Sequence, residues 1–108
     1  MRVLEYSVNN DTIQKTRGSD HSGLIPKSGE TVMLKFDFSN KWNDSVKVVE
    51  FTTRDGKECK PQILINDMCE IPEQALKEYI FYIRVLGKNS TELLTTKKAT
   101  ICQDGGKR

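Results

Sequence analysis

Hydrophobic and polar residues alternate along most of the chain, which is the pattern of β-strands with one buried face. The alternation is clearest over Thr31–Ser39, where the apolar positions fall on one face and Met33, Lys35 and Asp37 fall on the other. The apolar positions of this segment are Val32, Leu34, Phe36 and Phe38. A side-chain period of two therefore predicts a strand here with one face in the core.

The same signals predict several further short strands, separated by turn residues. They lie at Arg2–Val8, Val46–Thr53, Glu58–Ile65, Met68–Ile71 and Tyr79–Gly87, with a last strand or bent pair within Thr91–Gln103. Both faces of Tyr79–Gly87 are largely apolar, which is typical of a strand in the middle of a sheet. Pro61 cannot donate to a ladder, so its strand is expected at an edge or bulged.

Turn residues join these strands at short intervals. Asp55-Gly56 and Asn66-Asp67 favour tight hairpins, because these residue types tolerate positive φ angles. Pro72–Lys77 predicts one or two helical turns, with proline near the first helical position. We therefore expect an all-β fold, an antiparallel Ig-like β-sandwich of about seven short strands with one short helix near residues 72–77.

Length and composition fit one domain over residues 1–108. The Gly- and Ser-rich segment 16–30 is expected to be a mobile loop, and residues 104–108 a loose tail. Hydrophobic residues make up 36% of the chain and charged residues 30%, a globular balance. A net charge of +2 gives no reason to expect nucleic acid, and no apolar run predicts a membrane span.

Candidate chemistry is sparse, so we expect no enzyme, catalytic residue, cofactor or metal site. His21 is the only histidine and has no paired nucleophile. Cys59, Cys69 and Cys102 lack the close spacing of zinc ligands and are interpreted as small buried apolar residues of a reducing cytoplasm. Scattered acidic residues are interpreted as solvated surface groups.

Four residues are candidates for partner binding. Trp42 is either a core anchor or a platform for stacking a sugar, and the core is favoured. Ile80, Tyr82 and Leu86 form a second apolar face on the Tyr79–Gly87 strand. This face is covered by the opposite sheet, by the N-terminal arm, by segment 16–30 or by another protein chain, and in the last case it is an association surface.

The order of several segments resembles a known group of proteins. Thr31–Phe36 leads to Asn40-Lys41-Trp42-Asn43 and Val46–Phe51, followed by Cys69–Leu76, Ile83–Gly87 and Leu94–Ala99. This order is similar to small β-sandwich modules in the virions of tailed bacteriophages of Gram-positive bacteria, of baseplate, tail or head-fibre type. The resemblance spans residues 24–103 and marks a fold, so it implies no particular functional residue.

The resemblance implies a non-enzymatic structural or interaction module of the virion. Its partners would be other phage structural proteins, with a homo-oligomer expected from particle symmetry. A second hypothesis is a phage-encoded binder or inhibitor of a host protein or defence system, acting in the host bacterial cytoplasm. A third is a carbohydrate-binding module that uses Trp42.

Overall fold

The computed structural model describes residues 2–16, 31–78 and 80–102 of the chain. Within these ranges, strands dominate and helical structure is confined to single turns. The elements are β1 (Arg2–Asn9), β2 (Thr12–Lys15), β3 (Val32–Phe38), η1 (Asn40–Trp42), β4 (Val46–Thr53), β5 (Gln62–Ile63), β6 (Met68–Glu70), α1 (Glu73–Leu76), β7 (Ile80–Lys88), β8 (Leu93–Thr95) and β9 (Ala99–Cys102). The expected all-β class is confirmed, as is the short helix near residues 72–77.

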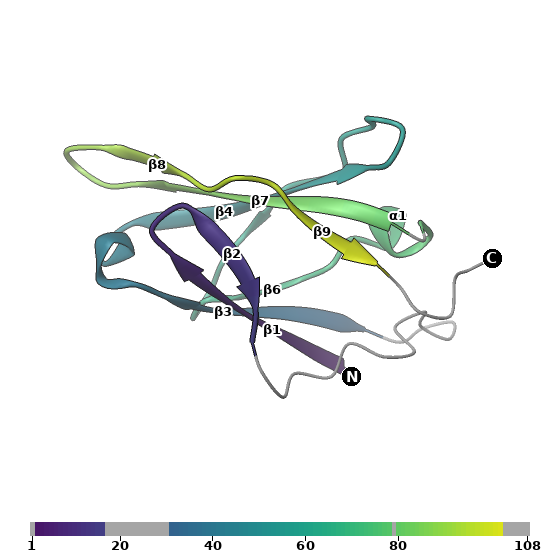
Figure 1. Ribbon diagram of the computed structural model, residues 1–108, viewed down its shortest axis with the longest axis horizontal. Helices are drawn as coiled ribbons and strands as arrows, with labels where there is room; N and C mark the ends of the chain where they lie inside the picture. Colours follow the sequence, from purple (N-terminus) through teal and green to yellow (C-terminus); the bar gives the residue numbers. More distant parts are fainter. Residues whose placement is uncertain (1, 17–30, 79, 103–108) are drawn as a thin grey trace.

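The strands form two sheets that lie one above the other in Figure 1. Sheet A has the order β2-β1-β3-β6, and sheet B has the order β5-β4-β7-β8, with β9 also paired to β7. The predicted central position of the 79–87 strand is confirmed, because β7 pairs with β4 on one side and with β8 and β9 on the other. Of the two alternatives predicted for the Pro61 strand, an edge or a bulge, the edge is observed, because β5 ends the order of sheet B.

One pairing departs from the expected antiparallel sandwich. β1 and β3 run parallel, from the pair Arg2 and Val32 to the pair Val8 and Phe38. Parallel neighbours need a long connection, and here β2 folds back on β1 before the chain reaches β3. The strand β2 was missed by the sequence pattern. The predicted loop 16–30 and tail 104–108 lie almost wholly outside the described residues, which resume at residue 31 and stop at residue 102.

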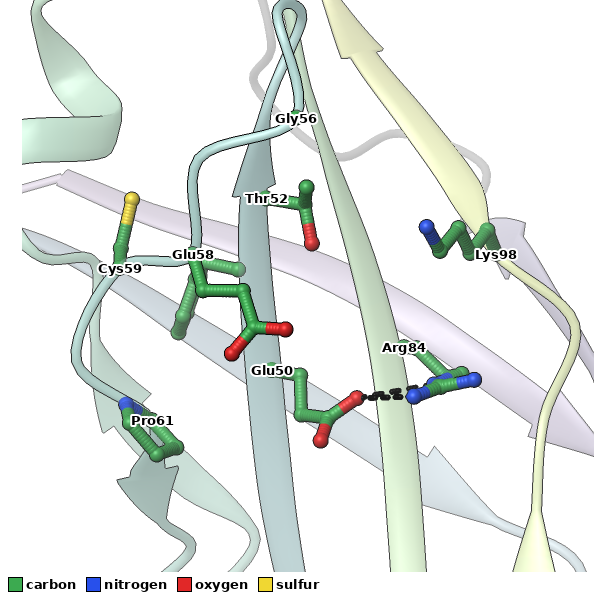
Figure 2. Close-up of a pocket in the computed structure, with 9 residues that line it drawn as sticks. Glu50, Thr52, Gly56, Glu58, Cys59, Pro61, Arg84 and Lys98 are labelled. Carbon is green, nitrogen blue, oxygen red and sulfur yellow. Dashed lines mark hydrogen bonds and ion pairs between the residues drawn. The ribbon is translucent and has the colours of Figure 1, made fainter.

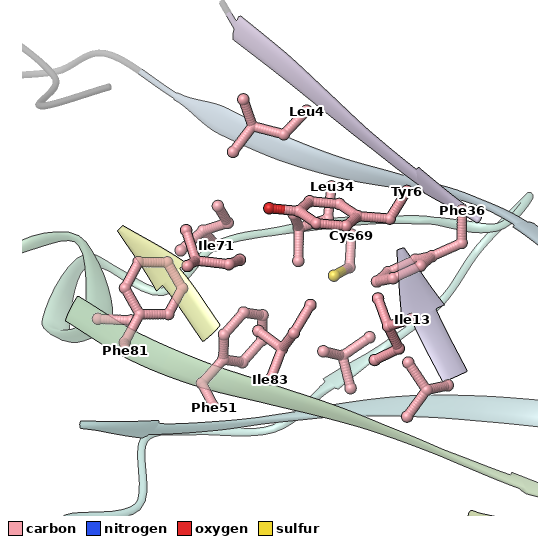
Figure 3. Close-up of a cluster of buried hydrophobic side chains, with 14 of the residues drawn as sticks. Leu4, Tyr6, Ile13, Leu34, Phe36, Phe51, Cys69, Ile71, Phe81 and Ile83 are labelled. Atoms are coloured by element: carbon pink, nitrogen blue, oxygen red, sulfur yellow. The ribbon is translucent and has the colours of Figure 1, made fainter. Parts of the chain in front are cut away.

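The core lies between the two sheets, as Figure 3 shows for the side chains that meet there. Leu34 and Phe36 of β3 point inward from sheet A, and Phe51 and Phe81 point inward from sheet B. Val32 of β3 is buried with them. All five are at most 3% exposed. The alternation predicted for Thr31–Ser39 therefore has the expected face in the core.

A tight turn joins the two layers at Asn66-Asp67, where the sequence predicts one. Asn66 and Asp67 adopt φ angles of 53° and 61°, and they connect the bridged residues Ile65 and Met68. Two consecutive positive φ angles give a turn whose twist matches that of the flanking strands. Only Gln62–Ile63 of the predicted Glu58–Ile65 strand forms a ladder, because Pro61 interrupts the pairing before it.

Candidate interaction surface on sheet B

The face of sheet B that points away from sheet A is the candidate functional site, and we call it the outer face. Alternation along β4 and β7 places every second residue of these central strands on it. Ile80, Tyr82 and Leu86, the predicted partner-binding residues of β7, are all half-buried there. Sheet A does not cover them, because it packs on the other side, and β1 belongs to sheet A. Residues 17–30, the other expected cover, lie outside the described residues.

One end of the outer face is apolar. Val46, Ile63, Ile65 and Leu93 are 65%, 63%, 72% and 68% exposed, and they are the exposed large hydrophobic residues of the described chain. Half-buried Val48 and Leu86 lie between them. We call these six residues the apolar half of the outer face.

The strand register brings the apolar half together from four segments. Val48 pairs with Ile63 on one side and with Leu86 on the other. Val46 pairs with Lys88, which pairs with Leu93. The Leu64 N–H donates to the Lys47 carbonyl, so the register continues and places Ile65 beside Val46. Two adjacent rows across the sheet are therefore nearly free of charge, with Lys88 as the exception.

Beside the apolar half, the outer face carries four charged residues, which we call the charged half. Glu50 and Glu58 come from β4 and the segment before β5, whereas Arg84 and Lys98 come from β7 and the segment before β9 (Figure 2). The four residues line a shallow hollow of about 230 Å³. Acidic groups lie on the β4 side of the sheet midline and basic groups lie on the β7 side.

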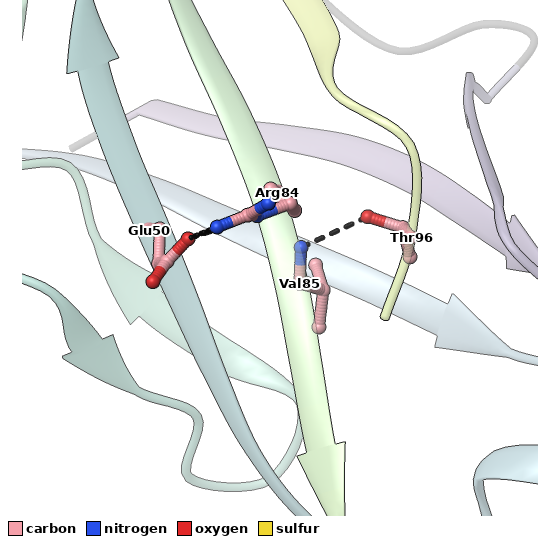
Figure 4. A network of polar contacts seen from close by, with 4 residues as sticks. All are labelled: Glu50, Arg84, Val85 and Thr96. Carbon is pink, nitrogen blue, oxygen red and sulfur yellow. Dashed lines mark hydrogen bonds and ion pairs between the residues drawn. The ribbon is translucent and has the colours of Figure 1, made fainter. Parts of the chain in front are cut away.

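Glu50 and Arg84 are direct cross-strand partners and form an ion pair. Arg84 Nε and Nη2 donate to the same Glu50 oxygen, at 2.9 Å and 2.5 Å (Figure 4). The two side chains are 41% and 38% exposed, so solvent screens the pair and its contribution to folding is small. Its significance lies in fixing two opposite charges at a defined place on the surface.

A bulge next to this pair determines where Lys98 lies. Leu86 pairs with Thr95 and Ile83 pairs with Ala99, so three residues oppose two between these points. Buried Thr96 stabilises the bulge, because its hydroxyl accepts a hydrogen bond from the Val85 N–H at 3.0 Å (Figure 4). The extra residue brings the backbone of Lys97 to sheet A, where its N–H donates to the Asp11 carbonyl at 2.8 Å. Lys98, the next residue, lies in the hollow with Arg84.

Trp42, the fourth predicted partner-binding residue, does not lie on the surface. Its side chain is 1% exposed, and its Nε1–H donates to the Asn10 carbonyl at 2.8 Å. Gly87 provides the space for the ring, since a Cβ at this position would lie 2.7 Å from Trp42 Cζ3. The core interpretation of Trp42 is therefore confirmed. Its interpretation as a sugar-stacking platform is wrong, because no ligand can reach a ring that is covered in this way.

The thiols differ from the sequence expectation in one case. Cys59 and Cys69 are buried, as predicted, but Cys102 is exposed at the end of β9. Burial raises the pKa of the Cys69 thiol to about 12, with Glu70 adding to the shift. Burial also raises the pKa of Cys59 and of the Tyr6 phenol. These shifts all stabilise the neutral form and leave the buried groups unreactive at neutral pH.

Two further features are absent from the described ranges, a metal-binding cluster and a membrane-spanning helix. These ranges contain no group of three or more His, Cys, Asp or Glu side chains that could hold a metal ion. His21 lies outside them. The described residues also include no helix that is long and apolar enough to cross a membrane.

Sequence reasoning found Ile80, Tyr82 and Leu86 but missed most of the apolar half. Ile63, Ile65 and Leu93 are single apolar residues on short segments, and only the sheet register brings them together. A usable signal was present in Val46–Phe51, where Val46 and Val48 have the opposite parity to the core residues Val49 and Phe51. Such double-sided apolar character predicts a strand covered on both faces.

Comparisons with protein-family models, curated protein sequences and solved structures gave no significant match.

Proposed function

We propose that this chain is a non-enzymatic protein-interaction module that binds its partners through the outer face of sheet B. The observation that supports this proposal is the gathering of all four exposed large hydrophobic residues of the described chain in the apolar half. Isolated apolar residues are ordinary on a surface, but a contiguous apolar patch on a small domain marks an association site. The ion pair and the other charges beside it would supply the polar rim of such an interface.

The proposal includes the setting that the sequence resemblance implies, a structural module in the virion of a tailed phage of Gram-positive bacteria. An Ig-like sandwich is part of the same proposal. It is supported by the chain path, which crosses between sheets after β3, after β5 and after β6. A sandwich of this kind offers two broad outer faces, and symmetric particles reuse such faces in repeated contacts.

The proposal is tested by measuring how much of the chain is present in purified phage particles. Cells infected with the encoding phage are lysed, the particles are purified on a density gradient, and the chain is quantified by mass spectrometry. We expect the wild-type chain at a fixed ratio to the major capsid protein. The double variant Val46→Lys, Leu93→Lys should be depleted from particles at least about tenfold, because it introduces two charges into the apolar half.

The matched control is Met33→Lys, which places a lysine at a half-buried position on the outer face of sheet A. This variant should enter particles as the wild type does. Absence of the wild-type chain from purified particles would refute the virion setting. A stoichiometric host protein on the same face would instead favour the host-binding hypothesis.

A further inference from the structure

We infer that the occupant of the outer face is a second copy of this chain, docked about a two-fold axis that runs parallel to β4 and β7. The inference rests on the proposed function and names its partner. The midline between the paired strands β4 and β7 divides the outer face into two sides. The pattern of charge on the two sides of this midline selects the symmetry.

A two-fold axis along the midline exchanges the two sides and keeps each row in place. Each residue of β4 then faces the copy of its own cross-strand partner on β7. Val48 would face Leu86 of the other copy, and Ile65 and Leu93 would meet at the margins of the same apolar layer. The strands of the two copies stay aligned, which is the usual arrangement of packed sheets.

The charged half becomes complementary under the same operation. Glu50 and Glu58 lie on the β4 side, whereas Arg84 and Lys98 lie on the β7 side. Exchange of the sides places the acidic pair of one copy over the basic pair of the other. The Glu50–Arg84 pair would then continue into a network of four charges across the interface, in which opposite charges face one another.

The other simple two-fold axis, perpendicular to the strands, gives an unfavourable arrangement. It places β7 on β7, so an axis through the row of Val48 and Leu86 would set Lys88 against Arg84 of the other copy. It would also set Glu50 against the apolar side chain of Val46. The axis along the strands also sets one charge, that of Lys88, against Val46, but along β4 and β7 it opposes no like charges and places Glu50 over Arg84. The contacts between like charges therefore decide against the perpendicular axis, and the charge pattern favours the axis along the strands.

The remaining described surface offers no equal alternative. The outer face of sheet A carries Glu5, Lys35 and Asp37 among its central residues, and all three are exposed. None of the exposed large hydrophobic residues lies on it. A second copy on sheet A would therefore bury charges with little apolar area to compensate.

The first test is the solution mass of the full chain by sedimentation equilibrium, over about 1 to 100 μM. We expect a dimer that dissociates on dilution. Leu86→Lys should raise the dissociation constant about 30-fold or more, because it places a charge at the centre of the apolar layer. Met33→Lys should leave the dissociation constant unchanged. Circular dichroism of each variant establishes that it is folded.

The second test addresses the axis. Single cysteines are introduced at Val48 and at Leu86 in a Cys102→Ser background, which removes the exposed native thiol. A short bismaleimide should link an equimolar mixture of the two variants faster than either variant alone, because position 48 faces position 86 of the other copy. Faster linking within either single variant would overturn the proposed axis.

These outcomes separate the inference from the proposed function. A wild-type monomer throughout the concentration range, or a dimer that persists in Leu86→Lys, would overturn the inference. Either result, combined with particle incorporation that still depends on Val46 and Leu93, would leave the proposed function standing with a different partner. Absence from particles together with an intact dimer would refute the virion setting alone.

Discussion

Both faces of sheet B carry large apolar residues, but these residues differ in their exposure to solvent. The inner face carries Phe51, Phe81 and Val85, none more than 1% exposed, whereas Val46 and Leu93 on the outer face are more than 60% exposed. The inner face is also closely packed against specific side chains, since Gly87 leaves room for the Trp42 ring. No described residue packs against the outer face in a comparable way. Apolar residues therefore mark both faces as surfaces that favour contact. Whether the contact forms within the chain depends on whether another element of the chain packs on that face.

The largest expected difference between the faces is in thiol reactivity. Cys102 lies on the outer side and is exposed, whereas Cys69 is buried between the sheets with its pKa raised to about 12. We expect iodoacetamide to alkylate Cys102 in the folded protein about a thousandfold or more faster than Cys69, which must await unfolding. Mass spectrometry of timed samples measures both rates. In concentrated urea the rates should converge, and similar rates in the native protein would contradict the burial of Cys69.

Removal of the Trp42 side chain should cause the largest loss of stability. Trp42→Ala deletes the ring above Gly87 and the hydrogen bond to Asn10, and it should cost about 3–5 kcal/mol in the free energy of unfolding. Urea unfolding followed by circular dichroism measures this change. A loss below about 1 kcal/mol would show that the ring contributes little to the core.

A smaller loss is expected when a methyl group is added beneath the same ring. Gly87→Ala forces contact with the Trp42 ring and should cost about 1–3 kcal/mol. In the Trp42→Ala background the same change should cost close to nothing, because the obstructing atoms are gone. Equal costs in the two backgrounds would mean that the ring and Gly87 are not coupled. Lys88→Ala, which alters the outward neighbour, serves as the control.

The smallest expected effect comes from Leu93 of β8, with its neighbour Leu94 as the comparison. Leu93 is 68% exposed and Leu94 is 5% exposed. At concentrations where the chain is monomeric, Leu93→Ser should change the free energy of unfolding by less than about 0.5 kcal/mol. Leu94→Ala should cost about 2–5 kcal/mol in the same urea titration. A large loss for Leu93→Ser in the monomer would mean that part of the chain covers the outer face.

The sequence predicted local structure well and long-range pairing poorly. The alternation in β3 identified its core face, and Asn66-Asp67 identified a hairpin, because both signals depend on neighbouring residues. β2 was missed, because Ile13 is its only apolar residue. The parallel pairing of β1 with β3 was also missed, since alternation fixes the face of a strand but not its neighbour.

The candidate surface was predicted only in part for the same reason. Ile80, Tyr82 and Leu86 stand on one strong strand, so their shared face was visible in the sequence. Ile63 and Leu93 come from two- and three-residue strands at opposite sides of the sheet. Trp42 was assigned to the core on its size alone, and only the structure shows that Gly87 makes room for it.

The parallel pair β1–β3 has a consequence for how the chain folds. Its register joins residues thirty positions apart, such as Arg2 and Val32. Closing a loop of this length costs entropy before any ladder contact forms, and it cannot begin during synthesis until β3 has left the ribosome. We therefore expect β4 and β5, whose partners Val48 and Ile63 are closer in the sequence, to pair with less delay, whereas β1 must wait for β3.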